Sequence, residues 1–142
     1  PLEFETMREY LLFANDQLLR LHRAARDQGS GRDNLAIDRA EAYIRANYMR
    51  PITLAVVSNE VSLNYAYFSN SFKKQTGRTF SEYLRDIRLD AAKKLLRQPD
   101  IRISEVAERV GYDSYKSFYR AFKESSGMTP AEYQQKQYRR QD

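Results

Sequence analysis

Apolar side chains recur every three to four residues along most of this 142-residue chain, which is the spacing of one buried face of an α-helix. In the first part of the chain they alternate steps of three and four without a break, at Phe4, Met7, Leu11, Ala14, Leu18, Leu21 and Ala25. This heptad-like stripe predicts a helix over residues 1–28. The helix either packs on its own domain or pairs through residues 4–25 with the same helix of a second protomer. The Gly and Ser residues that follow predict a flexible linker over residues 29–35.

From residue 36 onward the pattern breaks into shorter helices with clear starts and stops. The first of these has Ile37, Ala40, Tyr43 and Ile44 on one face. It must end before Pro51, because proline disfavours helical geometry in the residue ahead of it.

Capping residues mark the helices beyond Pro51. Thr53 and Asn64 have side chains that can accept hydrogen bonds from backbone N–H groups at a helix start. Thr79 opens the capping box TFSE, and Gly77 just before it can adopt the left-handed conformation that ends a helix. The long helix expected after Thr79 has its apolar positions at Phe80, Leu84, Ile87, Ala91 and Leu95.

An internal repeat links the two halves of this region. Residues 53–83 read TLAVVSNEVSLNYAYFSNSFKKQTGRTFSEY, and residues 102–133 read RISEVAERVGYDSYKSFYRAFKESSGMTPAEY. Matched positions lie 49 residues apart in the first helix of each copy and 50 apart from Phe68 and Phe118 onward, so the second copy has one extra residue in its turn. A short helix, a tight turn and a second helix with aromatic anchors at i and i+4 are typical of a helix-turn-helix unit.

These patterns together predict an all-α fold. Two helix-turn-helix units, at about 53–77 and 103–127, are joined by a connecting helix at about 79–97. A C-terminal helix follows at about 129–139, and the domain as a whole spans residues 36–142.

Composition narrows the chemistry that this chain can perform. There is no cysteine and one histidine, which excludes disulfides, thiolate metal sites and a Cys/His nucleophile. Without a Gly-rich phosphate loop or a His/carboxylate cluster, we expect neither an enzyme nor a metal or other cofactor. No apolar run approaches the roughly 20 residues that span a bilayer, so we expect no membrane contact by this segment and a cytoplasmic location.

The net charge of +5 is unevenly distributed. Residues 51–142 contain sixteen Lys and Arg against eleven Asp and Glu, whereas residues 1–50 contain eight of each. A basic bias confined to the repeated region favours a polyanionic partner there, although a solvated surface gives the same count.

The repeated region resembles the DNA-binding domain of the AraC/XylS family of bacterial transcription regulators. The similarity runs from about Ile37 to Tyr133 and rests on the paired motifs, on RLDAAKKLL at 88–96 and on FYRAFKESSGMTP at 118–130. It implies two helical subdomains bridged by a long helix, acting as activator or repressor at promoters where RNA polymerase binds. It also implies an upstream effector domain, of which a two-component receiver is one option. The chain departs from the family at Ser62, where glycine is common, and in its aromatic Tyr65-Ala66-Tyr67.

The polar side of each second helix would then face double-stranded DNA. Phe68 and Phe72, and in the second copy Phe118 and Phe122, define the buried sides. The candidates for base contact on the opposite sides are Tyr65, Ala66, Ser69, Asn70, Tyr115, Lys116, Ser117 and Arg120. The candidates for phosphate contact are Asn64, Lys73, Lys74, Arg78, Thr79, Ser114, Lys123 and Thr129.

Two of these residues keep alternative interpretations. The guanidinium of Arg120 can read guanine through O6 and N7, or it can hold a phosphate. Tyr65 can stack on sugar and phosphate, or it can cover its own subdomain.

Two other functions compete with sequence-specific regulation. One is a helical interaction module that dimerises through the N-terminal stripe. The other, a nonspecific binder of RNA or single strands, is disfavoured because the phenylalanines have core spacing and form no stacking platform.

Overall fold

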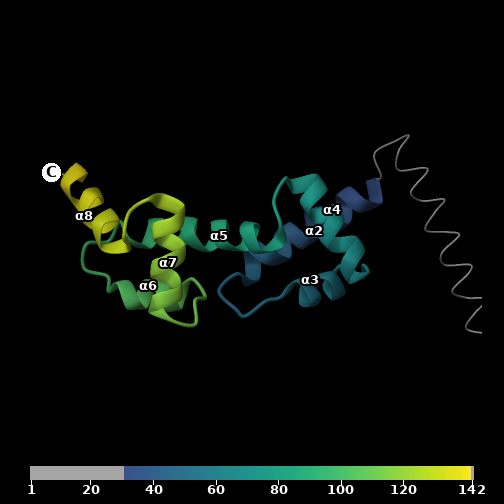
Figure 1. The fold of residues 1–142 in the computed structure, drawn as a ribbon, viewed down its shortest axis with the longest axis horizontal. Helices are drawn as coiled ribbons and strands as arrows, with labels where there is room; N and C mark the ends of the chain where they lie inside the picture. The colour runs from purple at the N-terminus through teal and green to yellow at the C-terminus, as the bar shows by residue number, and fades with distance from the viewer. Residues whose placement is uncertain (1–30, 142) are drawn as a thin grey trace, which may run out of the picture.

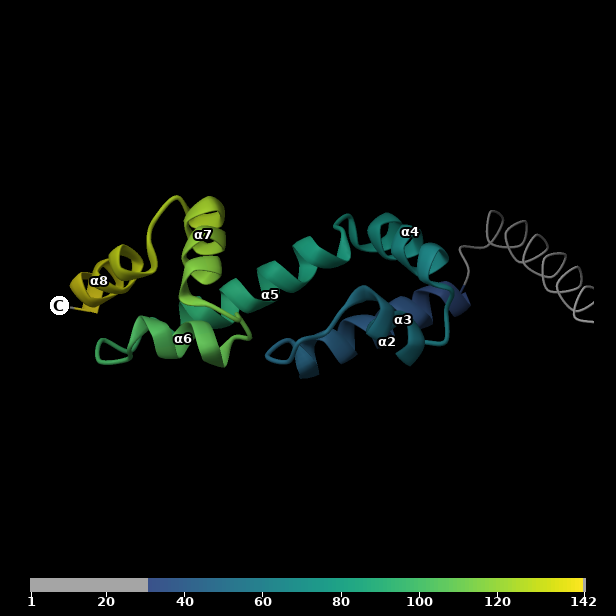
Figure 2. The same cartoon turned by 60° about the horizontal axis from the view of Figure 1, so that its bottom comes forward.

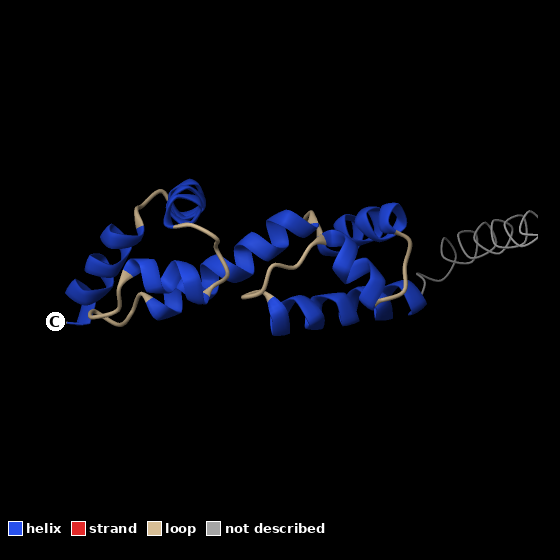
Figure 3. Cartoon of the chain, turned by 90° about the horizontal axis from the view of Figure 1, so that it is seen from below, coloured by secondary structure: helices blue, strands red, loops and turns tan. Residues whose placement is uncertain are grey.

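A computed structural model describes residues 31–141, and within that range every regular element is an α-helix. The helices are α2 Gly31–Asn47, α3 Leu54–Glu60, α4 Tyr65–Thr76, α5 Phe80–Leu95, α6 Ile103–Arg109, α7 Tyr115–Ser126 and α8 Pro130–Gln141. Figure 1 shows an elongated molecule in which α5 runs through the middle, with α2 to α4 at one end and α6 to α8 at the other. The same division holds in Figure 2 and Figure 3. The predicted all-α fold of two subdomains on a long helix is confirmed.

The first subdomain packs α2, α3 and α4 around a phenylalanine pair. Phe68 and Phe72 of α4 are fully buried, as are Ile44 of α2 and Val57 of α3. The ring centroids of the two phenylalanines lie 5.6 Å apart in a tilted arrangement, a geometry that favours aromatic contact. The i, i+4 spacing seen in the sequence therefore marks the core side of α4.

The second subdomain repeats this plan with α6 and α7. Phe118 and Phe122 are fully buried, their centroids are 5.7 Å apart, and Val106 and Val110 pack beside them. Tyr133 of α8 meets Phe122 edge-on at 5.5 Å, which closes the end of this core.

The connecting helix contributes different faces to the two cores. Tyr83 and Leu84 are buried in the first core, whereas Leu89, Ala92 and Leu96 are buried in the second. Leu84 and Leu89 point about 140° apart around the helix axis, because each residue turns an α-helix by about 100°.

The single stripe predicted for this helix is therefore wrong in its second half. Ala91 and Leu95 are only partly buried, and the residues that follow them, Ala92 and Leu96, are the ones buried in the second core. A stripe on one face would suit a helix lying on one core, but this helix passes between two cores on different sides.

The two helix-turn-helix turns differ by one residue, as the repeat predicts. After α3, Ser62 adopts φ 56° and the N–H of Leu63 donates to the carbonyl of Ser58 at 2.9 Å. After α6, Gly111 adopts φ 100° and the N–H of Tyr112 donates to Ala107 at 3.0 Å. Ser62 thus supplies the left-handed residue that glycine supplies in the second turn, and Asp113 is the extra residue.

The linker predicted over residues 29–35 is wrong from residue 31, because α2 begins at Gly31. The hydroxyl of Tyr67 on α4 donates to the carboxylate of Asp33, which ties the first turn of α2 to the first subdomain. An acidic residue in a first turn also interacts favourably with the helix dipole. The helix predicted over 1–28 and its stripe at 4–25 lie outside the described residues, as do residues 29 and 30.

Helix caps form where the sequence placed them, and they permit a test. The side chain of Thr53 accepts a hydrogen bond from the N–H of Val56 at 3.2 Å. Thr53→Ala should lower the free energy of unfolding by about 1 kcal/mol, and Thr53→Ser should restore most of it. Urea denaturation followed by circular dichroism measures both, and an unchanged midpoint in the alanine variant would contradict the cap.

Candidate nucleic-acid interface

The helices α4 and α7 each present a polar side opposite their buried phenylalanines. On α4, Tyr65, Ala66 and Asn70 are exposed and Ser69 is half-buried. On α7 the exposed residues are Tyr115, Lys116, Ser117 and Arg120. All eight candidates for base contact therefore have surface to offer a ligand.

Several of these residues occupy equivalent positions in the two copies. Asn70 corresponds to Arg120, each two residues after the first buried phenylalanine of its helix. Tyr65 and Tyr115 are each the first residue of their helix, and they are 56% and 47% exposed. The two repeated units therefore leave a tyrosine exposed at the same place.

The candidates for phosphate contact at the starts of α4 and α7 already act as helix caps. The side chain of Asn64 accepts from the N–H groups of Ala66 and Tyr67, at 3.0 and 3.3 Å. Ser114 accepts from the N–H of Ser117 at 3.1 Å, and its hydroxyl also donates to the Ser117 hydroxyl at 3.0 Å. These bonds satisfy some, though not all, of the first-turn backbone donors that a phosphate could bind, and they stabilise the helix starts whether or not DNA is bound.

Thr79 and Thr129 cap the helices that follow. Thr79 accepts from the N–H of Glu82 at 3.2 Å, and Thr129 accepts from the N–H of Glu132 at 3.1 Å. The N–H of Thr129 donates in return to the Glu132 carboxylate at 3.2 Å, which completes a capping box.

The basic candidates for phosphate contact differ in whether another side chain already contacts their charged group. Lys73 and Lys74 are exposed on the last turns of α4. The ammonium of Lys123 lies 5.9 Å from the centre of the Tyr119 ring. Arg78 donates to the carboxylate of Asp86 at 2.7 Å, so a phosphate would compete with that ion pair.

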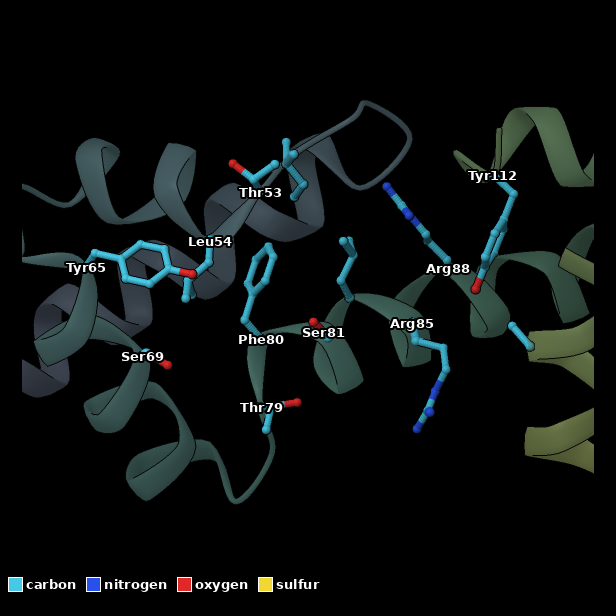
Figure 4. A pocket seen from close by; sticks show the side chains of 13 residues that line it. Thr53, Leu54, Tyr65, Ser69, Thr79, Phe80, Ser81, Arg85, Arg88 and Tyr112 are labelled. Atoms are coloured by element: carbon cyan, nitrogen blue, oxygen red, sulfur yellow. The ribbon is translucent and has the colours of Figure 1, made fainter. Parts of the chain in front are cut away.

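A hollow of about 600 Å³ lies between the two subdomains beside α5. Tyr65 and Ser69 of α4 line it at one side and Ala121 of α7 at the other, so both second helices border it. Arg85 and Arg88 of α5 line it as well, and in Figure 4 their side chains point away from each other.

Arg85 was missed in the sequence, where it is one basic residue among many. Only its position on α5 could have marked it. Ser81, Arg85 and Arg88 share one face of the helix, and each of them directly follows a residue of the apolar stripe that includes Leu84. The exposed guanidinium lies between the two subdomains and interacts with Asp86 at 3.6 Å.

Two kinds of feature are absent from the residues that the structure describes. Among residues 31–141, no three His, Asp or Glu side chains gather as a metal site would need. None of the described helices combines the length and the apolar character needed to cross a bilayer.

The chain is similar to known helix-turn-helix proteins. A family model described as a helix-turn-helix domain matches residues 57–136. The uncharacterised transcriptional regulator YobQ of Bacillus subtilis is 34% identical over 97 residues, which cover 68% of this chain and 40% of YobQ. The chain thus spans less than half the length of the curated relatives it matches first.

Solved structures share the fold. The C-terminal domain of AraT, a response regulator from Geobacillus stearothermophilus, is 33% identical with a TM-score of 0.69, covering 71% of this chain and 84% of that one. The DNA-binding domain of AdpA, solved with a target DNA, has a TM-score of 0.70 and covers 73% of this chain and 94% of that one. At 22% identity, AdpA shows the fold alone.

The fold and its two exposed helix faces define a double helix-turn-helix DNA-binding domain. The chain belongs to the AraC/XylS family of helix-turn-helix transcription regulators, as its sequence motifs suggested.

Proposed function

We propose that this domain regulates transcription by reading two adjacent major-groove segments of one DNA duplex, with α4 in one segment and α7 in the next. The observation that carries the proposal is the equivalent exposure of Tyr65 with Asn70 and of Tyr115 with Arg120, on helices whose opposite sides are fully buried. Helices presented in this way fit the major groove, and successive segments recur about every 34 Å along one face of B-DNA.

Within this proposal the two faces read different bases. Asn70 can make two hydrogen bonds to adenine, and the methyl group of Ala66 suits a thymine methyl group. Arg120 can make two hydrogen bonds to guanine, where the equivalent Asn70 cannot. Ser69, Lys116 and Ser117 complete the two base-reading faces.

Phosphate contacts would fix the register of the domain on the duplex. We assign them to Lys73, Lys74 and Lys123, to the helix starts at Asn64, Ser114, Thr79 and Thr129, and to Arg78 once its ion pair with Asp86 opens. The exposed Arg85 lies between the two reading helices, which is where the backbone separating the two groove segments would pass.

Alanine at Arg120 and at Lys74 should separate base reading from phosphate binding. Arg120→Ala should remove the preference for one base pair, because a bidentate contact to a base contributes about 1–3 kcal/mol of discrimination against the wrong base. Lys74→Ala should weaken all duplexes by a similar factor and reduce the salt dependence by about one ion. Both residues are exposed, so neither change should disturb folding.

Selection of bound duplexes from a random library, followed by affinity measurements at several salt concentrations, provides the test. We expect two short conserved blocks about one helical turn apart, with one position degenerating in Arg120→Ala. Equal affinity for every duplex would rule out sequence-specific reading by this domain.

The rest of the regulatory protein is part of the same proposal. AraT is described as a response regulator, and this chain covers 40% of YobQ, which supports an effector or receiver domain elsewhere in the full protein. We further propose action as activator or repressor beside RNA polymerase in the cytoplasm, without catalysis, and we retain pairing through residues 4–25 as a route to a dimer.

A further inference from the structure

Three segments from different parts of the fold meet at one side of α5. They are the chain just after α2, at residues 48–50, Arg88 in the middle of α5, and the turn of the second unit at Gly111 and Tyr112. The first segment belongs to one subdomain and the third to the other. The two subdomains are therefore in direct contact at this side of α5.

Arg88 bonds to the first subdomain through two nitrogens. Its Nε donates to the carbonyl of Tyr48 at 2.8 Å, and its Nη2 donates to the carbonyl of Arg50 at 3.0 Å. Both carbonyls lie just beyond the C-terminus of α2, where the helix dipole favours a cation. The forked geometry of a guanidinium allows the two bonds at once, which a lysine ammonium on its flexible stem does not reproduce.

The same guanidinium contacts the second subdomain. Its central carbon lies 5.6 Å from the centre of the Tyr112 ring, and Figure 4 shows that ring beside the Arg88 side chain. The Tyr112 ring in turn packs on Phe118 at 5.5 Å, inside the second core. Partial burial lowers the pKa of Arg88 from its ordinary value, but an arginine stays charged in a protein.

The backbones of the two subdomains also approach each other closely at this junction. A Cβ on Gly111 would lie 2.7 Å from the Tyr48 carbonyl oxygen, 3.0 Å from the Cα of Met49 and 3.1 Å from the Nε of Arg88. The Tyr48 side chain packs against both cores. The contact between the subdomains is therefore made at close range by specific groups, and α5 is not their only connection.

We propose that Arg88 is a positioning residue that fixes the orientation of α4 relative to α7, and thereby sets the spacing between the two DNA blocks that the domain accepts. The DNA part rests on the proposed function; the orientation of the two helices does not. Without Arg88, the Tyr48 and Arg50 carbonyls and the Tyr112 ring lose their common partner, and rotation of one subdomain about α5 becomes less restricted.

The spacing test uses Arg88→Gln and duplexes that differ in the gap between the two selected blocks. The wild-type domain should lose about tenfold or more in affinity when one base pair is inserted. Arg88→Gln should bind the best duplex about tenfold more weakly than the wild type does. Its affinity should then fall by less than about threefold when the base pair is inserted. Affinity for a duplex with a single block should stay the same.

Arg85→Gln is the matched control. It removes the same charge from the same helix one turn earlier, where the guanidinium is exposed and bonds neither subdomain's backbone. It should weaken all duplexes similarly and keep the full penalty for the insertion. An Arg88→Gln variant that also keeps the full penalty would overturn the proposal.

A second measurement needs no DNA. The chain has no cysteine, so spin labels can be attached uniquely at Lys74→Cys and Glu124→Cys, equivalent exposed positions on α4 and α7. The distance distribution between the labels should be narrow in the otherwise wild-type protein and broader in Arg88→Gln, with Arg88→Lys between them. Equal widths in all three would overturn the positioning role, whereas broadening with no two-block recognition would retain that role and reject the proposed function.

Discussion

Phe118→Ala should lower the free energy of unfolding of the second subdomain by about 3–5 kcal/mol. The Phe118 ring is fully buried, with ring centroids of Tyr112 at 5.5 Å and Phe122 at 5.7 Å. Removing it loses buried apolar area and leaves a cavity that neighbours on short, capped helices can fill only in part. Differential scanning calorimetry should show the second subdomain melting earlier, as a separate transition from the first.

Tyr115→Ala, a change on the same helix α7, should leave the stability of the domain nearly unchanged. The ring of Tyr115 is 47% exposed and contacts Tyr119 at 6.0 Å, so its loss should cost little stability. In the proposed interface it should nevertheless weaken DNA binding. A Phe118→Ala protein that melts like the wild type would mean that the aromatic pair does not hold this core together.

Gly111→Ala should destabilise the junction between the subdomains more than any other glycine substitution in the repeats. The φ of 100° lies beyond the ordinary left-handed region, and holding a side chain there costs about 1–3 kcal/mol. The new Cβ would also meet the backbone at Tyr48 and Met49, which must move, at a further cost of about 1–3 kcal/mol. Urea denaturation measures the total.

Gly127→Ala separates the two costs. Gly127 has φ 74° at the C-terminus of α7, and a Cβ there would meet nothing within 4 Å. Its cost should therefore be that of the left-handed backbone alone, about 1–2 kcal/mol. Equal losses for the two variants would show that the close approach at Gly111 relaxes freely.

The local elements and the sides on which they pack could be derived from the order of the amino acids alone. Phenylalanines four residues apart are on one face of any α-helix, so Phe68 with Phe72 and Phe118 with Phe122 could be assigned to cores before any coordinates. Caps such as Thr53 and the left-handed Gly77 act within a few residues, and they too are found where the sequence predicts them. The exposed sides of α4 and α7 followed by exclusion, while their DNA contacts stay a prediction.

Features that depend on contacts between distant segments became visible only in the folded domain. The first turn of α2, which begins at Gly31, receives a hydrogen bond at Asp33 from Tyr67, 34 residues further along the chain, and a local glycine signal cannot reveal such a contact. The core side of α5 changes between Leu84 and Leu89 because a different subdomain lies against each half. Arg88 looks like any basic residue until the chain after α2 and the turn at Gly111 meet around it. Periodicity and capping report interactions over one or two helical turns, whereas the relative placement of the two subdomains depends on groups that come together only when the whole domain folds.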